Sequence, residues 1–259
     1  MTKIKLEGHP GDMTCALTNI PAFPGEKFTF GYPEAIGDVA APFWFWQIKP
    51  TWEPRADGMW VSNGEQSGEL AYAMTVTAEE DVVTTRFKLT NHSSRTWSQG
   101  MAFNCFQCAK APSIRDHDCL RHWVRTGGKF TRLWNVPRVL GPRPALQLYN
   151  VENAPLARDL PFVANFQSTP DTVIEPWMAI VSRDGKRLVA TVSKPGLFLF
   201  QNREYSCIHC GAGFGELKPG QTAEALNKVY FVKSTLEQWH ERMTRELSAA
   251  VTQGATTKL

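Results

Sequence analysis

The 259-residue sequence has no long hydrophobic run. None of its apolar stretches approaches the roughly 20 residues that a membrane-spanning helix needs, so we expect no membrane partner. The N-terminal stretch MTKIKLEGHPGDMTC also lacks the apolar segment of a signal peptide and is typical of a strand. We therefore expect a cytoplasmic protein.

The sequence also has little net charge. Its 28 Lys and Arg residues nearly balance 25 Asp and Glu residues, which gives a net charge of +3 at pH 7. Proteins that bind nucleic acids carry a clustered basic face, whereas the charges here are scattered along the chain. We therefore exclude a nucleic-acid partner.

Cysteine is too scarce for a disulfide scaffold, with six residues in the whole chain. Four of them form two Cys-x-x-Cys pairs, Cys105/Cys108 and Cys207/Cys210. A zinc site with four thiolates needs each pair in a turn that brings both sulfurs together. On a strand, residues three positions apart point to opposite faces. We therefore expect buried free thiols, with no metal and no cofactor.

Short apolar or alternating runs bounded by turn residues fill most of the chain, which indicates strands. We predict an all-β fold of two large antiparallel sheets packed face to face, in one domain over residues 1–251. One helix is predicted over residues 235–249, with a capping box of Ser234 and Glu237, covering a sheet edge or an open end. Leu236, Trp239, Met243 and Leu247 share its apolar face. Residues 252–259 are predicted to form a flexible tail.

The most aromatic stretch is FWFWQIKPTWEPR, residues 43–55. Aromatic side chains on both faces of Phe43–Lys49 predict a central strand that is mostly core. Where this strand ends, Lys49, Trp52 and Arg55 offer a ring face and hydrogen-bonding groups of the kind that line saccharide clefts.

The segment YSCIHCGAGFG, residues 205–215, contains the best candidate for chemistry. In a strand over Tyr205–Cys210, Ile208 and Cys210 share one face and Cys207 and His209 share the other. If Ile208 and Cys210 face the core, His209 faces the open side of the sheet, where an imidazole can exchange protons near neutral pH. The alternative is a structural or surface histidine.

Two further groups of charged residues are candidates for substrate binding. Arg203 and Glu204 precede the histidine strand and could bind a sugar hydroxyl or carboxylate, or they could form a solvated hairpin end. Asp116 and Asp118 flank His117 and could orient its imidazole or ligate a divalent metal, although such charged loops are usually only solvated.

Three stretches of the sequence resemble the galactose mutarotase-like (aldose epimerase-like) superfamily. Val82–Asn91 followed by SSRTWSQGMAFNCFQC resembles its strand, Asn-rich turn and strand, and Ser193–Asn202 resembles its Pro-Gly strand. Leu217–Gln221, leading to Val229–Phe231, is similar to the motif that opens its final strand. The resemblance covers residues 82–232 loosely and implies a β-super-sandwich.

The resemblance also suggests roles for individual residues. His209 falls at about the position of the family's catalytic carboxylate, and the strand that should carry its general-acid histidine has Asn104 and Gln107 instead. These departures count against ordinary mutarotase activity. We expect a carbohydrate-active protein with a small-molecule or oligosaccharide substrate, a sugar or uronate, and epimerase-like or lyase-like proton transfer. His209 would be its base, with Asn104 or Gln107 as the orienting group and Arg203 or Arg55 binding an anion. The alternative is a non-catalytic carbohydrate-binding or accessory protein of the same fold.

Overall fold

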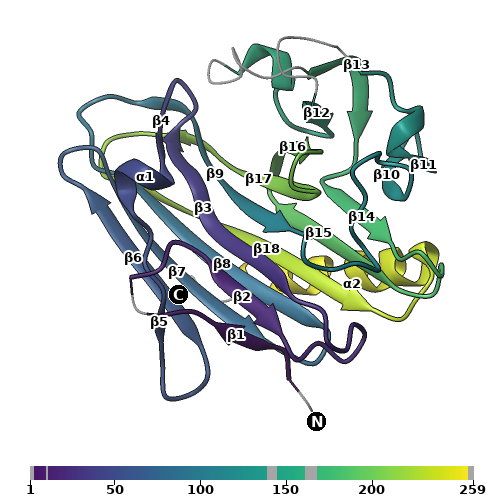
Figure 1. Ribbon diagram of the computed structural model, residues 1–259. Helices are drawn as coiled ribbons and strands as arrows, with labels where there is room; N and C mark the ends of the chain where they lie inside the picture. Colours follow the sequence, from purple (N-terminus) through teal and green to yellow (C-terminus); the bar gives the residue numbers. More distant parts are fainter. Residues whose placement is uncertain (1–2, 10, 139–144, 161–167, 256–259) are drawn as a thin grey trace.

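The computed structural model describes residues 3–9, 11–138, 145–160 and 168–255, and these form two nine-stranded sheets packed face to face (Figure 1). The all-β, two-sheet architecture predicted from the alternation is therefore confirmed. None of the helices in the described part of the chain is long and apolar enough to cross a membrane.

The first sheet, called sheet A, has the order β1-β2-β3-β9-β17-β16-β12-β13, with β4 paired to β3. All of its pairs are antiparallel except β12 with β13, which run parallel. Its strands are β1 (Lys5–Glu7), β2 (Cys15–Thr18), β3 (Phe28–Asp38), β4 (Ala41–Trp44), β9 (Trp97–Gln107), β12 (Leu146–Val151), β13 (Ser168–Ile174), β16 (Gly196–Asn202) and β17 (Cys207–Leu217).

The second sheet, called sheet B, has the order β11-β10-β14-β15-β18-β8-β7-β6-β5 and is antiparallel throughout. Its strands are β5 (Glu53–Pro54), β6 (Trp60–Gln66), β7 (Leu70–Ala78), β8 (Val82–Asn91), β10 (His122–Thr126), β11 (Lys129–Arg132), β14 (Trp177–Val181), β15 (Leu188–Lys194) and β18 (Thr222–Val232). Short helical turns are α1 (Phe45–Ile48), η1 (Leu133–Asn135) and η2 (Ala157–Asp159).

The main core lies between the two sheets, where inward side chains of both interdigitate. Phe28 of β3 and Phe106 of β9 stack with ring centroids 5.6 Å apart. Phe231 of β18 approaches the Phe28 ring edge-on at 5.1 Å from the opposite sheet. This aromatic contact fixes the face of sheet A that points inward, and with it the face that remains for a site.

The C-terminal helix α2 (Leu236–Ala255) covers the outer face of sheet B rather than an edge or open end. Trp239 is buried against the ring of Trp177, with centroids 5.0 Å apart, and Met243 and Leu247 continue the same apolar stripe as predicted. The helix is longer than the predicted 235–249. Its capping box also lies one residue later, because the Thr235 hydroxyl accepts a hydrogen bond from the Gln238 amide and the Gln238 side chain accepts one from the Thr235 amide.

Candidate functional site

His209 lies on the outer face of sheet A, on the side that strand alternation predicts. Ile208 and Cys210, its neighbours on β17, belong to the core between the sheets. The imidazole is nevertheless only 1% exposed. The rings of Phe200 and Phe103 lie 4.4 and 6.0 Å from it, which corrects the expectation that His209 faces an open groove.

A single glycine allows this aromatic cover to sit so close to the sheet. A Cβ atom at Gly211 would come within 2.7 Å of the Phe198 ring. Phe198 can therefore lie flat against β17, with its ring centroid 5.5 Å from that of Phe103. The two phenylalanines then hold the wall beside His209 in place.

Glu34 is the charged partner of His209. The register of β3 against β9 shifts between Gly31 and Ala35, and the irregular segment brings Glu34 Oε2 to 3.0 Å from His209 Nε2. The other ring nitrogen, Nδ1, lies 3.1 Å from the carbonyl oxygen of Phe200. Because a carbonyl only accepts, Nδ1 carries a hydrogen. Both ring nitrogens of His209 are therefore already engaged.

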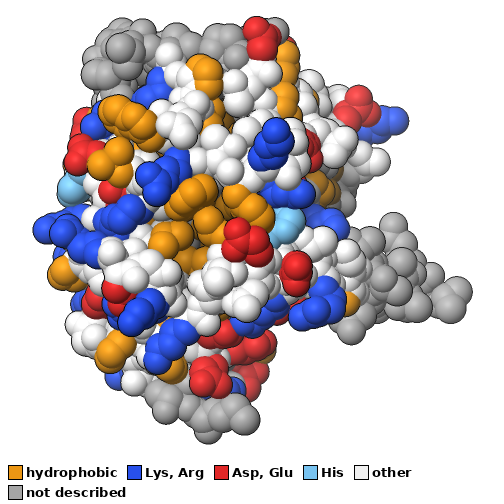
Figure 2. Space-filling view, turned by 90° about the vertical axis from the view of Figure 1, so that its right-hand side faces the viewer, with side chains coloured by type: hydrophobic (Ala, Val, Ile, Leu, Met, Phe, Trp, Pro, Cys, Tyr) orange, Lys and Arg blue, Asp and Glu red, His pale blue; other side chains and the backbone are white. Residues whose placement is uncertain are grey.

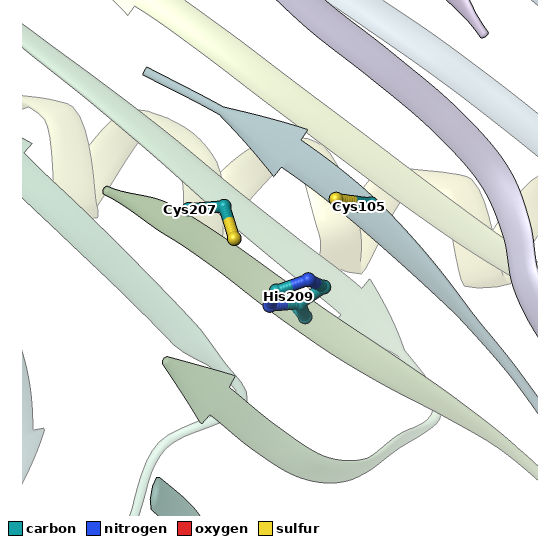
Figure 3. A group of neighbouring side chains, drawn as sticks. All are labelled: Cys105, Cys207 and His209. Atoms are coloured by element: carbon teal, nitrogen blue, oxygen red, sulfur yellow. The ribbon is translucent and has the colours of Figure 1, made fainter. Parts of the chain in front are cut away.

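Two thiols complete the group. Cys207 precedes His209 by two residues on the same face of β17, and Cys105 projects from the neighbouring strand β9 (Figure 3). Their sulfurs and a His209 ring nitrogen all lie within 4.8 Å of one another. Within the described ranges, this is the one group of three metal-ligating side chains at such distances. Gln107 Nε2 donates a hydrogen bond of 3.4 Å to Cys105 Sγ.

Burial and neighbouring charges shift the pKa of His209 in opposite directions. Burial by itself lowers the pKa of His209, but the Glu34 carboxylate and Cys105 raise it, with a net pKa of about 10. The hydrogen bond with Cys207 and burial both raise the pKa of the Cys105 thiol. The direction of the His209 shift favours an imidazolium paired with Glu34.

A small hollow of about 120 Å³ opens this group to the surface. Glu34 lines it with its partly exposed side chain, and Cys105 and Gln107 form its floor. The rest of the lining is Met13, Thr14, Gly31, Pro33 and Phe45. Since pockets for whole small molecules usually measure roughly 300–1,000 Å³, the hollow has room for one polar group of a ligand and not for a complete sugar.

A tryptophan pair with one exposed ring stands beside the hollow. The residues predicted as a central strand, Phe43–Lys49, instead form the end of β4 and the helical turn α1, because the Gln47 side chain accepts a hydrogen bond from the Trp44 amide. The rings of Trp44 and Trp46 stack at 5.3 Å with their planes 2° apart, and Trp46 is 57% exposed. The prediction that this stretch is mostly core is therefore wrong.

The pair is connected to the hollow by ladder position and by ring contacts. Trp44 pairs with Ala35, the residue next to Glu34, and its ring lies 5.8 Å from Phe103. Phe45, between the two tryptophans in sequence, lines the hollow itself. The tryptophans and Glu34 therefore lie on the same side of the outer face of sheet A.

The structure separates the two amide residues that were offered as alternatives. Asn104 is buried between the sheets, where its Oδ1 accepts a 2.8 Å hydrogen bond from the Cys210 amide and its Nδ2 donates to Thr191. Gln107 lies on the outer face and contacts Cys105. Of the two, only Gln107 shares a face with His209.

Arg203 and His117 form a separate contact between two loops. His117 Nδ1 lies 2.6 Å from the Arg203 carbonyl oxygen, and Arg203 Nε donates to the His117 carbonyl at 2.7 Å. The Arg203 guanidinium also lies 3.4 Å from Asp118. Glu204 follows in the same turn and its amide donates to the Asn202 side chain. None of these side chains lines the hollow beside Glu34.

Asp116 does not converge with Asp118 around His117. Its carboxylate accepts from the Arg121 amide and lies 2.9 Å from Nδ1 of His122, a buried histidine that the sequence did not single out. The geometry therefore does not support the hypothesis that Asp116 and Asp118 ligate a divalent metal.

The three residues predicted at the exit of the aromatic strand are dispersed. Trp52 is fully buried in the main core, next to Phe30 and Trp60, so its predicted place in a cleft is wrong. Arg55 lies 3.8 Å from Glu53 on β5, at the far edge of sheet B. Lys49 ends α1 as an exposed residue with a left-handed φ of 44°.

Charge is scattered over one flank of the molecule. On the flank shown in Figure 2, Lys and Arg side chains alternate with Asp, Glu and hydrophobic side chains. The flank does not carry the single-sign basic face that nucleic-acid binding would need.

The four-thiolate zinc site considered from the sequence is excluded by strand geometry. Cys108 and Cys210 are part of the main core, whereas Cys105 and Cys207 lie on the outer face of sheet A. Each Cys-x-x-Cys pair is thus divided between two faces of its strand, as the alternation predicts.

Glu34 is the important residue that the sequence analysis missed. It stands in the stretch FGYPEAIG, where no motif marks it, and it reaches His209 only because β3 and β17 both flank β9. The one available signal was Pro33, since proline inside a strand indicates an irregularity.

No protein-family model and no curated protein matches the sequence. Several solved structures are similar to the chain. A proposed aldose 1-epimerase from Escherichia coli K12 is 8% identical, with 89% of this chain and 99% of that chain covered and a TM-score of 0.47. A galactose mutarotase-like protein from Lactobacillus casei is 9% identical, with coverage of 88% and 100% and a TM-score of 0.46. A galactose mutarotase related enzyme from Lactobacillus acidophilus is 7% identical, with coverage of 90% and 98% and a TM-score of 0.46. The solved structures similar to this chain thus include proteins with names from the superfamily that the sequence motifs resemble.

Proposed function

We propose that the chain binds a sugar or uronate on the outer face of sheet A and that Glu34 transfers a proton to or from it. The observation that carries this proposal is the Glu34–His209 pair, 3.0 Å apart, of which Glu34 lines a hollow beside the Trp44–Trp46 stack. Indole rings offer the flat apolar face on which the C–H surface of a sugar packs. The hollow then receives one substituent of that sugar next to Glu34 and Gln107.

The roles differ from those expected from the sequence. His209 is enclosed and has both nitrogens engaged, so it cannot take a proton directly from a ligand. Glu34 lines the hollow and is 22% exposed, so it is the group that can touch a ligand. His209 contacts one oxygen of the Glu34 carboxylate and so fixes the orientation of this carboxylate. Gln107 borders the same hollow as a hydrogen-bonding group. Proton abstraction by Glu34 is the step that epimerase-like and lyase-like reactions share.

A second candidate function is sugar binding without catalysis. The observation that favours it is the size of the hollow, about 120 Å³, which leaves most of a sugar ring outside on the tryptophans. In this case Glu34 and Gln107 would serve only as hydrogen-bonding groups at the end of a stacking platform.

The experiment measures binding and proton exchange separately. A panel of neutral sugars and uronates is titrated by calorimetry, and exchange of sugar C–H hydrogens is followed by NMR in D₂O. Trp46→Ala should weaken binding by up to about tenfold, the loss of one stacking contact. Glu34→Gln should keep most of the affinity and abolish exchange, because the amide cannot accept the proton.

The matched control is Trp134→Ala, which removes a similarly exposed tryptophan, at 58%, that does not line the hollow. Failure of every panel sugar to bind, or equal weakening by Trp46→Ala and Trp134→Ala, would refute the sugar proposal. Binding without any exchange by the unmodified chain would leave the non-catalytic function. Exchange that survives in Glu34→Gln would remove Glu34 from the role of base.

A further inference from the structure

Cys105, Cys207 and His209 form a compact three-residue group that the proposed sugar chemistry does not use. They come from two paired strands, with Cys105 on β9 and the other two on β17 (Figure 3). Their potential ligand atoms lie within 4.8 Å of one another. Two thiols and an imidazole at such distances are the donor set that Zn²⁺ prefers, since its tetrahedral sites combine Cys and His ligands.

We propose that this group is a binding site for a thiophilic divalent cation, Zn²⁺ being the expected one, with Cys105, Cys207 and His209 as ligands. Glu34 lies outside the group of donor atoms within 4.8 Å of one another, and its partly exposed side chain would have to shift to take the fourth position. Glu34 Oε2 and His209 Nε2 are 3.0 Å apart. Two donor atoms that each lie about 2.0–2.1 Å from one zinc ion in a tetrahedral site are separated by a similar distance. The same geometry that makes an ion pair without metal thus suits two ligands of a single ion.

The surroundings of the ligands support this assignment. His209 Nδ1 donates its hydrogen to the Phe200 carbonyl, which leaves Nε2 as the nitrogen that faces Glu34. A ligating histidine in proteins almost always has such a partner on its other nitrogen. Gln107 Nε2 donates to Cys105 Sγ, a hydrogen bond that favours the thiolate form over the thiol.

An ion would have a route to the site and a reason to stay there. Cys105 and Glu34 both line the hollow, whereas Cys207 and His209 are enclosed behind them. Binding converts the two thiols to thiolates and removes the Nε2 proton of the imidazolium, and all of these protons pass to solvent. The charge of the ion then offsets the anionic ligands in a place that water hardly reaches.

This inference goes beyond the proposed function, although both proposals use Glu34. An ion ligated by Glu34 would occupy the carboxylate that the sugar chemistry uses as a base, so metal occupancy and proton transfer exclude one another at this site. Sugar affinity at the tryptophans and metal affinity at the thiols are therefore measured, and can fail, separately.

The chain supplies its own matched controls, because each Cys-x-x-Cys pair has one member on each face of its strand. The full chain is purified under reducing conditions and titrated with Zn²⁺ against a competing chelator. Co²⁺ serves as a spectroscopic probe of tetrahedral thiolate coordination. Cys105→Ala and Cys207→Ala are compared with Cys108→Ala and Cys210→Ala, whose sulfurs belong to the core.

We expect about one Zn²⁺ per chain, and loss of roughly tenfold or more in affinity in Cys105→Ala and in Cys207→Ala. The two core-facing variants should bind as the unmodified chain does, with thermal unfolding used to confirm that all four are folded. Three results would overturn the proposal. They are no stoichiometric binding by the reduced chain, equal losses in both kinds of variant, and a Cys105–Cys207 disulfide that persists after reduction.

Discussion

The two sheets differ in how their outer faces are covered. Sheet B has α2 along its outer face, where Trp239 fills the space above Trp177 and Tyr230. Arg242 of this helix pairs with Asp81, and Glu246 accepts from Lys228 and Tyr230, so the charged groups around the helix are matched. This face is closed by a regular element that carries paired charged side chains.

Sheet A has a second apolar cluster on its outer face, formed by residues such as Met101, Phe103 and Phe198. Beside it stand the exposed Trp46 ring and the hollow with Glu34. Polar and nucleophilic side chains therefore gather on the face that no long helix of the described chain covers. Sheet B with α2 is thus the covered part of the fold, and sheet A carries the candidate site on its outer face.

The largest expected effect comes from opening the covered face. Trp239→Ala should lower the free energy of unfolding by about 3–5 kcal/mol, because a fully buried indole is lost and a cavity is left above Trp177. Urea unfolding measures this change. A loss below about 0.5 kcal/mol, the usual size at exposed sites, would mean that α2 contributes little to the stability of sheet B.

A smaller loss is expected between the sheets. Asn104→Ala should cost about 1–3 kcal/mol, because the buried Cys210 amide loses its acceptor. Sugar affinity should stay unchanged, since Asn104 faces away from the hollow. Calorimetric titration beside urea unfolding checks both statements. A folded variant with altered affinity would contradict the separation of the two faces of sheet A.

The enclosed histidine outside the site should give a pH dependence of stability. Burial lowers the pKa of His122, against the opposing effect of Asp116, while Arg121 and Arg138 lower it further. The unfolded chain therefore takes up this proton more readily than the folded one. The stabilisation is complete above the unfolded pKa of 6.5 and is lost as the pH falls toward the lower folded pKa.

The slope from this residue is at most about 1.4 kcal/mol per pH unit. His122→Gln should remove this slope. The difference in the free energy of unfolding between the unmodified chain and the variant should therefore narrow from about pH 7 to about pH 5. Urea unfolding at several pH values measures the slope. Asp116, whose pKa is lowered from 3.8, titrates below this window. Parallel pH profiles of the two chains would show that His122 is not the titrating group.

The smallest stability effect is expected at the open face. Trp46→Ala should change the free energy of unfolding by less than about 0.5 kcal/mol, because the ring is largely exposed. Measured beside Trp239→Ala, this variant allows the contributions to stability of two tryptophans on opposite outer faces to be compared. A loss comparable to that of Trp239→Ala would mean that Trp46 belongs to the packing of the fold.

Some features of the site were predictable because they depend on local alternation. The face of His209, the division of each Cys-x-x-Cys pair and the apolar stripe of α2 all follow from a period of 2 or 3.6 residues. The prediction of a central strand over Phe43–Lys49 was wrong for a different local reason. The Gln47 side chain caps a helical turn, and the aromatic pattern gives no sign of it. The prediction that Trp52 lines a cleft was wrong because tryptophan side chains are found both in protein cores and in sugar clefts.

The sequence by itself determined a two-sheet β fold with an amphipathic C-terminal helix, and it determined which residues of β17 share a face. Only the tertiary structure decided that Glu34 meets His209, that Cys105 and Cys207 join them, and that aromatic rings enclose the imidazole. The physical reason is the distance along the chain over which each kind of interaction acts. Alternation acts between neighbours along one strand, whereas these contacts depend on which strands pair, on their register and on the irregularity in β3.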